Sequence, residues 1–178
     1  MRLKKIILSA LFISLNIVLT RFLSIQTPIV RLGFGTVPIL LAGMMLGVKY
    51  TVIIALISNM LGATVFATSG AVFFPGFTLN AVLIGLLAGI LLYETKEKRH
   101  SNLKFLGLLI LTQALIMGVV TAFLTPIWLI IMWGELGWYI FWMRIVFNLG
   151  IVAIEIPVIL GIRHAIRPLL DKYIYEEI

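Results

Sequence analysis

The sequence predicts an all-α membrane protein, with six transmembrane helices in one compact bundle. Two observations lead to this fold class. Of the 178 residues, 62% are hydrophobic and 12% are charged, whereas soluble domains are about 45–50% apolar. The apolar residues also form long runs, whereas a membrane barrel needs alternating polar and apolar residues, so spanning helices are expected.

Breaks in the apolar sequence divide it into six predicted helices. The segments are 5–25, 32–47, 50–68, 78–93, 103–132 and 138–166. Pro28 separates the first two, because proline disfavours helix at the residue before it. The second segment is about 24 Å long at 1.5 Å per residue, which is short for a bilayer. The first is expected to be a retained helix, since no small-residue cleavage site follows its apolar run.

Lys and Arg are distributed unevenly between the predicted loops. Eleven of the 14 fall on one side: at the N-terminus, in the connection 47–50, in the loop 94–104 and in the C-terminal tail. Cytoplasmic loops of membrane proteins carry an excess of these residues. Both termini are therefore predicted to be cytoplasmic in a multi-pass protein of the cell membrane. Arg21, Arg31 and Arg144 fall in the outer half.

Several function classes are disfavoured by what the sequence lacks. It has no cysteine, which excludes disulfides and cysteine metal sites, and its two histidines are far apart, so no metal site is predicted. It has neither a Gly-x-Ser-x-Gly motif nor a P-loop. The net charge of +7 follows membrane topology rather than a nucleic-acid surface. We expect no enzyme activity, no cofactor and no nucleic-acid partner.

The turn 73–81 is the most informative stretch of the chain. It carries three phenylalanines, a Pro75-Gly76 breaker and Thr78, whose hydroxyl is placed to cap the following helix. The predicted topology puts this turn on the outer face. A plain turn between helices rarely needs so much aromatic surface, so we predict a ligand site in which Phe74 and Phe77 either stack on the ligand or shape the covering surface.

The outer half is predicted to be electropositive and to favour an anionic ligand. Helices two, four and six begin there, and each helix N-terminus carries about half a positive charge. Arg21 and Arg31 flank the first outer loop, which begins at Gln26, and each is a candidate carboxylate clamp or an interfacial anchor. Arg144 lies about 9 Å into helix six, where a charge is a functional hypothesis by default. Asn148 lies one turn further on the same face.

Two glutamates remain in the apolar sequence. Glu135 lies in the last outer loop near Trp133, where it could accept N–H bonds from a heterocycle stacked on an indole, or pair with Arg144. The tryptophans of this loop, Trp128 among them, also fit an ordinary interfacial belt. Glu155 lies near the inner side and is predicted to serve packing or the cytoplasmic interface, with a proton relay as the alternative.

These features resemble the substrate-binding S-components of energy-coupling factor (ECF) vitamin transporters, over essentially the whole chain. Ala10-x-x-x-Ser14 in the first helix matches the family's small-residue motif, usually Ala-x-x-x-Ala, which docks on the transmembrane coupling subunit. Within the family the chain looks most like the folate-specific members. The segments that carry this likeness are 20–25, 31–35 with Pro38, and above all 73–79; Asn80 stands where a smaller residue such as serine is expected.

The resemblance implies a function for residues 1–178 as a single transmembrane substrate-binding domain. Folate or a reduced folate would be captured from outside a bacterial plasma membrane. The loaded subunit would then join a coupling protein and two cytoplasmic ATPases, topple in the lipid bilayer and release its substrate inside. The implied substrate-binding residues are the candidates above: Arg21, Gln26, Arg31, Phe74, Phe77, Thr78, Trp133, Glu135, Arg144 and Asn148.

Alternatives stay open beside this reading. The chain could be an S-component for a different vitamin, although a cationic ligand such as thiamine would need more acidic groups than Glu135 in the outer half. It could also be a solitary small-metabolite carrier, which would work without the coupling module. A membrane enzyme lacks a nucleophile–base pair here, and a structural scaffold leaves the electropositive outer half unexplained.

Overall fold

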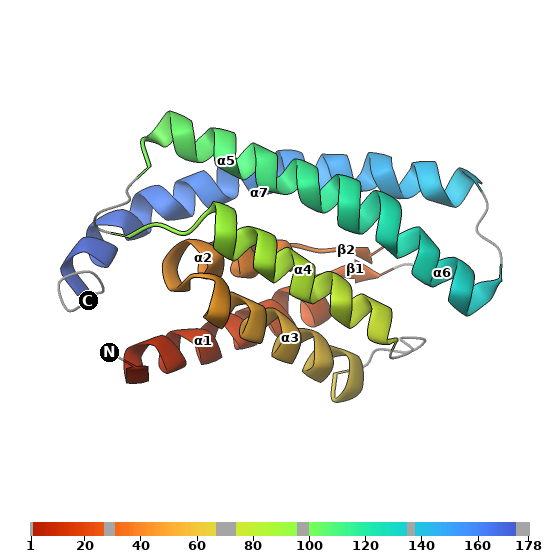
Figure 1. The fold of residues 1–178 in the computed structure, drawn as a ribbon, viewed down its shortest axis with the longest axis horizontal. Helices are drawn as coiled ribbons and strands as arrows, with labels where there is room; N and C mark the ends of the chain where they lie inside the picture. Colours follow the sequence, from red (N-terminus) through yellow and green to blue (C-terminus); the bar gives the residue numbers. More distant parts are fainter. Residues whose placement is uncertain (1, 27–30, 67–73, 96–99, 135–137, 174–178) are drawn as a thin grey trace.

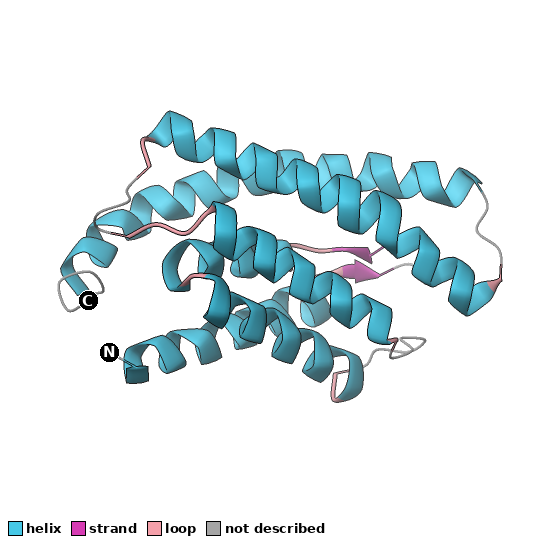
Figure 2. Ribbon diagram, in the orientation of Figure 1, coloured by secondary structure: helices cyan, strands magenta, loops and turns pink. Residues whose placement is uncertain are grey.

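The computed structural model describes residues 2–26, 31–66, 74–95, 100–134 and 138–173, and these are almost entirely helical (Figures 1 and 2). The exception is a short antiparallel pair, β1 (Ile25–Gln26) with β2 (Arg31–Leu32). The first helical run comprises α1 (Arg2–Ile17) and the π-helical turn η1 (Val18–Phe22). The all-α prediction is confirmed, and the first helix ends slightly earlier than predicted because residue 25 is already extended.

The second helix, α2 (Thr36–Leu46), forms the centre of the molecule. Every residue from Val37 to Leu46 is buried, and α2 contacts α1, α3 (Val48–Thr64), α4 (Pro75–Leu91) and α7 (Trp138–Tyr173). A helix that is apolar on every side belongs inside other protein. Its 11 residues, fewer than the predicted segment, follow from the pairing of Arg31 and Leu32 in β2.

Small residues allow α4 to approach α2 and α3 closely. A Cβ atom added to Gly43 of α2 would lie 2.7 Å from the carbonyl carbon of Ala88, and one added to Gly89 would lie 2.5 Å from the Cα of Val48. Such contacts between backbones are how helices pack in membranes, where apolar side chains alone give little preference. Gly47 connects α2 to α3 with a φ of 76°, a conformation that favours glycine.

A second layer is built from the long helices of the C-terminal half. The helices α5 (Asn102–Leu115), η2 (Ile116–Leu124) and α6 (Thr125–Trp133) follow one another without a break, and α7 runs beside them (Figure 1). Three helical runs are long and apolar enough to cross a membrane, Leu3–Phe22, Asn102–Met132 and Phe141–Ile166, whereas α2, α3 and α4 are shorter apolar helices. Each of the six predicted segments therefore contains a helix among the described residues, and three of the described helical runs have spanning length.

The start of α1 and the end of α7 lie at the same end of the molecule, together with the α2–α3 connection and the start of α5 (Figure 1). The opposite end collects the strand pair, the start of α4, the end of α6 and the start of α7. This alternation is the one that the predicted topology requires. Which end faces the cytoplasm stays a prediction.

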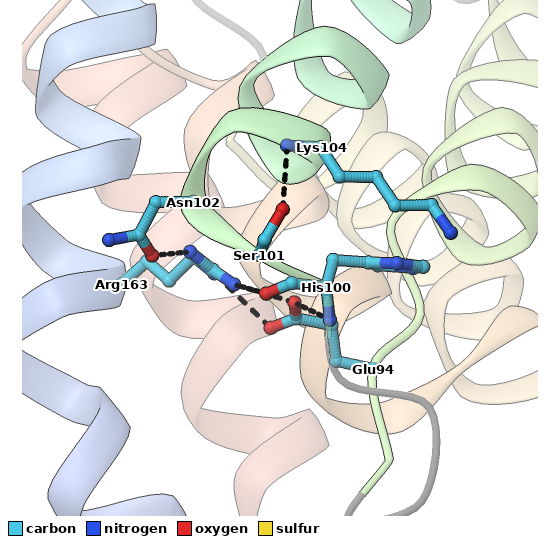
Figure 3. Close-up of polar contacts among 6 residues, drawn as sticks. All are labelled: Glu94, His100, Ser101, Asn102, Lys104 and Arg163. Atoms are coloured by element: carbon cyan, nitrogen blue, oxygen red, sulfur yellow. Dashed lines mark hydrogen bonds and ion pairs between the residues drawn. The ribbon is translucent and has the colours of Figure 1, made fainter.

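A buried ion pair closes the end that holds the start of α1, and we call it the Arg163 cluster (Figure 3). Arg163 donates from Nη2 to Glu94 Oε1 at 2.7 Å and from Nη1 to Asn102 Oδ1 at 3.0 Å. Its guanidinium carbon lies 4.0 Å from the centroid of the Phe105 ring. Arg163 is one of the basic residues counted toward the C-terminal tail; it is 4% exposed, and it joins α7 to the α4–α5 connection.

Candidate functional site

The candidate site begins where α4 begins, at the end of the molecule opposite the Arg163 cluster. Phe74 has an extended backbone and precedes Pro75, the first residue of α4. Proline suits this first helical position because its missing N–H would have no partner inside the helix. The prediction that Thr78 caps α4 is wrong, because the helix starts three residues earlier and Phe74 occupies the cap position without a side-chain bond.

Thr78 instead links α4 to α3. Its hydroxyl donates to the Asn59 side-chain carbonyl at 3.1 Å. One turn further along α3, Gly62 packs directly against the guanidinium of Arg21, since a Cβ added there would lie 2.8 Å from Arg21 Nε. Residues three apart on a helix are neighbours on one face. The structure thus brings Arg21, from the end of the first helix, to the face of α3 that also contacts Thr78 of α4.

Three rings gather at the start of α4, and we call them the aromatic cluster: Phe74, Phe77 and Trp128. The Phe74 ring centroid lies 5.9 Å from that of Phe77 and 5.9 Å from that of Trp128. Edge-to-face and offset arrangements at such distances are favourable. A Cβ added to Gly76 would lie 2.5 Å from Cδ2 of Trp128, so the indole reaches the backbone of α4. Two predicted site residues, Phe74 and Phe77, therefore lie together.

Hydrogen bonds fix the indole of Trp128 in this cluster. Its Nε1–H donates to Asn80 Oδ1 at 3.0 Å, and Asn80 Nδ2 donates to the Thr125 hydroxyl oxygen at 3.1 Å. Sequence reasoning missed this network, because it treated Trp128 as part of an interfacial belt and Asn80 only as a departure from the expected serine. That departure was the available signal, since a larger polar residue on a buried face needs a partner.

The start of α7 carries the two predicted residues Arg144 and Asn148. Both side chains are half-buried, and Asn148 Nδ2 donates to the Arg144 carbonyl oxygen at 2.7 Å. Among the described residues, the Arg144 guanidinium has no ion-pair or hydrogen-bond partner. A cation at this depth is costly unless something pairs with it. The amide of Asn148, by contrast, is partly used by its own helix.

The remaining predicted site residues are placed only by their backbone or not at all. Gln26 and Arg31 stand opposite one another in the strand pair, which brings the two ends of the first outer loop together. Trp133 is the last residue of α6. Glu135 lies outside the described residues.

Two other predictions concern residues away from the aromatic cluster. Ala10 and Ser14 are both exposed on α1, and the Ser14 hydroxyl donates to the Ala10 carbonyl oxygen at 3.0 Å. The predicted docking residues are thus accessible on the described surface. Glu155 is 1% exposed and accepts from Gln113 Nε2 at 2.7 Å, so it joins α7 to α5 in the interior, as the packing interpretation predicts.

Comparison with known proteins gives consistent matches over most of the chain. Residues 4–163 match the family described as "ECF transporter, substrate-specific component". A protein of Clostridium novyi (strain NT) named "Folate transporter FolT" is 38% identical over 152 residues, which are 85% of this chain and 83% of that protein. The solved structure "Crystal structure of FolT bound with folic acid" has a TM-score of 0.75 and 27% identity, over 88% of this chain and 90% of its own.

These matches bear on the kind of protein rather than on single side chains. The family and the Clostridium relative are transport components and not enzymes, in agreement with the sequence analysis. The family match covers residues 4–163, and the relative and the solved structure cover 85% and 88% of this chain. The chain belongs to the substrate-specific components of ECF transporters.

Proposed function

We propose that this protein is the folate-binding subunit of an ECF-type importer. The observation that carries the proposal is the aromatic cluster at the end of the bundle where α7, which carries Arg144 near its start, begins (Figure 1). Folate combines a flat pterin with a glutamate tail that bears two carboxylates. Aromatic faces suit the pterin, and guanidinium groups suit the carboxylates, which they bind through paired N–H bonds.

The names of the relatives support the same ligand. One relative is called a folate transporter, and the solved relative holds folic acid. The proposed site comprises the aromatic cluster with Arg21, Thr78, Arg144 and Asn148, and Gln26, Arg31, Trp133 and Glu135 complete it. The start of α4 adds the partial positive charge of a helix N-terminus, which favours an anion nearby.

Transport then requires partners that this chain does not contain. The exposed small-residue face at Ala10 and Ser14 would dock on the coupling subunit, and two cytoplasmic ATPases would supply the energy. The protein would sit in the bacterial plasma membrane as a six-helix, multi-pass subunit with both termini inside. Loaded with folate, it would topple within the complex and release the ligand to the cytoplasm.

Calorimetric titration of the purified protein tests the ligand. We expect tight binding of folic acid or 5-formyltetrahydrofolate, and little or no heat with thiamine. A protein that carries no pterin after purification and gives no heat with either folate would contradict the proposal. Uptake in cells without the coupling module would favour the solitary-carrier alternative.

The orientation has its own test, because the chain contains no cysteine. Single cysteines at Lys49 and Leu23, both exposed and at opposite ends, can be labelled with a membrane-impermeant thiol reagent. We expect labelling of intact cells at residue 23 and labelling at residue 49 only after lysis. The reverse pattern would overturn the proposed orientation.

A further inference from the structure

We infer that Asn80 is a positioning residue of the ligand site, acting on the ligand through Trp128. The inference deepens the proposed function, because it rests on the aromatic cluster as the place where the ligand binds. It begins from the burial of Asn80, which is 7% exposed although it lies in the second turn of α4. A buried amide must find partners for its donor and its acceptor.

Both partners of Asn80 come from one turn of α6. Oδ1 accepts from the Trp128 indole at 3.0 Å, and Nδ2 donates to the Thr125 hydroxyl oxygen at 3.1 Å. The Thr125 hydroxyl itself donates to the Val120 carbonyl oxygen at 2.7 Å. The amide therefore spans two residues that lie three positions apart on α6, which fixes both the rotation of α6 against α4 and the orientation of the indole.

The indole orientation matters because Trp128 forms part of the aromatic cluster. Its ring lies against Phe74 on one side and against the backbone at Gly76 on another. An indole has a single hydrogen-bond donor, Nε1–H, and Asn80 occupies it. Trp128 therefore offers the ligand ring surface alone. The geometry suits a planar conjugated group that stacks on the Trp128 ring. A ligand group that needs a hydrogen bond from this side chain would fit poorly.

The first test needs no ligand. In protein labelled with ¹⁵N-tryptophan, the indole N–H signal of Trp128 is the one lost in Trp128→Phe. We expect Asn80→Ala to shift this signal and to speed its exchange with water, since its acceptor is gone. Asn102→Ala truncates an asparagine side chain at the other end of the molecule and should leave the signal unchanged. An unchanged Trp128 signal in Asn80→Ala would overturn the inference.

The second test is a double-mutant cycle on folate affinity. One hydrogen bond contributes about 0.5–1.5 kcal/mol, so Asn80→Ala and Trp128→Phe should each weaken binding about two- to tenfold. If Asn80 acts through the indole, the double variant should be little weaker than either single variant. Trp142→Phe, which alters an indole that is 58% exposed on α7, supplies the control and should combine additively with Asn80→Ala.

The two tests separate this inference from the proposed function. A wild-type protein that does not bind folate would reject the folate proposal, while the indole signal would still decide whether Asn80 holds Trp128. Strictly additive losses for Asn80→Ala and Trp128→Phe would show that Asn80 supports the fold without positioning the ring. In that case Asn80→Ala would lower the unfolding temperature and the affinity independently of residue 128.

Discussion

The two ends of the bundle are closed by different chemistry. At one end, Arg163 is buried against Glu94, Asn102, the His100 carbonyl and the Phe105 ring. At the other end, three rings and a neutral amide form the contacts, and Arg144 lies half-buried without a carboxylate partner among the described residues. An arginine whose three side-chain nitrogens all donate hydrogen bonds holds helices together, whereas one with open donors can bind an incoming anion.

Removal of the ion pair should have the largest effect on stability. Arg163→Ala removes the guanidinium that pairs with the buried Glu94 carboxylate, and breaking a buried ion pair by removing one partner typically destabilises by about 3–5 kcal/mol. We expect a clearly lower unfolding temperature in detergent, measured by tryptophan fluorescence. Lys104→Ala, at an exposed neighbouring lysine, is the matched control.

The same variant also tests whether the two ends are independent. Protein that remains folded with Arg163→Ala should bind folate as the wild type does, because the substitution lies at the far end. A double variant, Glu94→Leu with Arg163→Leu, should recover part of the lost stability because it removes both charges. Equal unfolding temperatures for Arg163→Ala and Lys104→Ala would show that the cluster contributes nothing to stability.

Arg144→Ala should have the opposite effect to Arg163→Ala: weaker folate binding with little change in stability. A hydrogen bond to a charged group contributes about 1.5–3 kcal/mol, so the affinity for folate should fall about 10- to 100-fold. The unfolding temperature should change little, since no described residue pairs with this guanidinium. Calorimetric titration measures the first and thermal unfolding the second. Arg144→Lys keeps the charge but not the paired donors, and should recover only part of the affinity.

Gly76→Ala should disturb the aromatic cluster more mildly. The added Cβ would lie 2.5 Å from Trp128, and forcing an extra methyl group into a packed site typically costs about 1–3 kcal/mol. We expect about tenfold weaker folate binding with a modest drop in stability. Gly107→Ala is the control, because a Cβ there meets nothing within 4 Å, and alanine favours the helix. Equal effects of the two substitutions would contradict the packing observed at Gly76.

Ser14→Ala should have the smallest effect. Among the described residues, the Ser14 hydroxyl bonds within its own helix alone, and alanine restores the family's usual motif. We expect unchanged folate binding and undiminished co-purification with the coupling subunit. Ala10→Leu, in contrast, should abolish co-purification while leaving folate binding intact. Normal co-purification of Ala10→Leu would show that the coupling subunit docks on another surface.

The number and order of the helices follow from the sequence, because each apolar run forms one helical segment. Each predicted helix is present. Pro75 and Gly47 mark helix boundaries because of their own backbone preferences: proline suits the first position of a helix, and glycine accepts the positive φ between two helices. The π-helical turns η1 and η2 were not predicted, since the same apolar pattern fits either helix type. Thr78 was predicted to cap the helix because a threonine hydroxyl suits that position, but the helix already begins at Pro75.

The site was less predictable because its contacts join distant parts of the chain. Phe74 and Phe77 are three residues apart, so one motif suggested both. Asn80 and Trp128 are 48 residues apart, and Glu94 and Arg163 are 69 apart. No periodicity within a helix records which turn of another helix faces it. A pair of polar residues in apolar segments signals that partners exist, but the packing of α4, α6 and α7 selects them.

The complete enclosure of α2 has a consequence for how the protein responds to its lipid environment. At about 16 Å, α2 is far shorter than a hydrocarbon core of about 30 Å, yet its residues from Val37 to Leu46 are buried inside the protein, so a length mismatch has almost no surface on which to act. The run Asn102–Met132 is about 46 Å long at the usual rise and must tilt to fit the same core. A change in membrane thickness would therefore alter the tilt of the outer helices around a centre that feels no lipid.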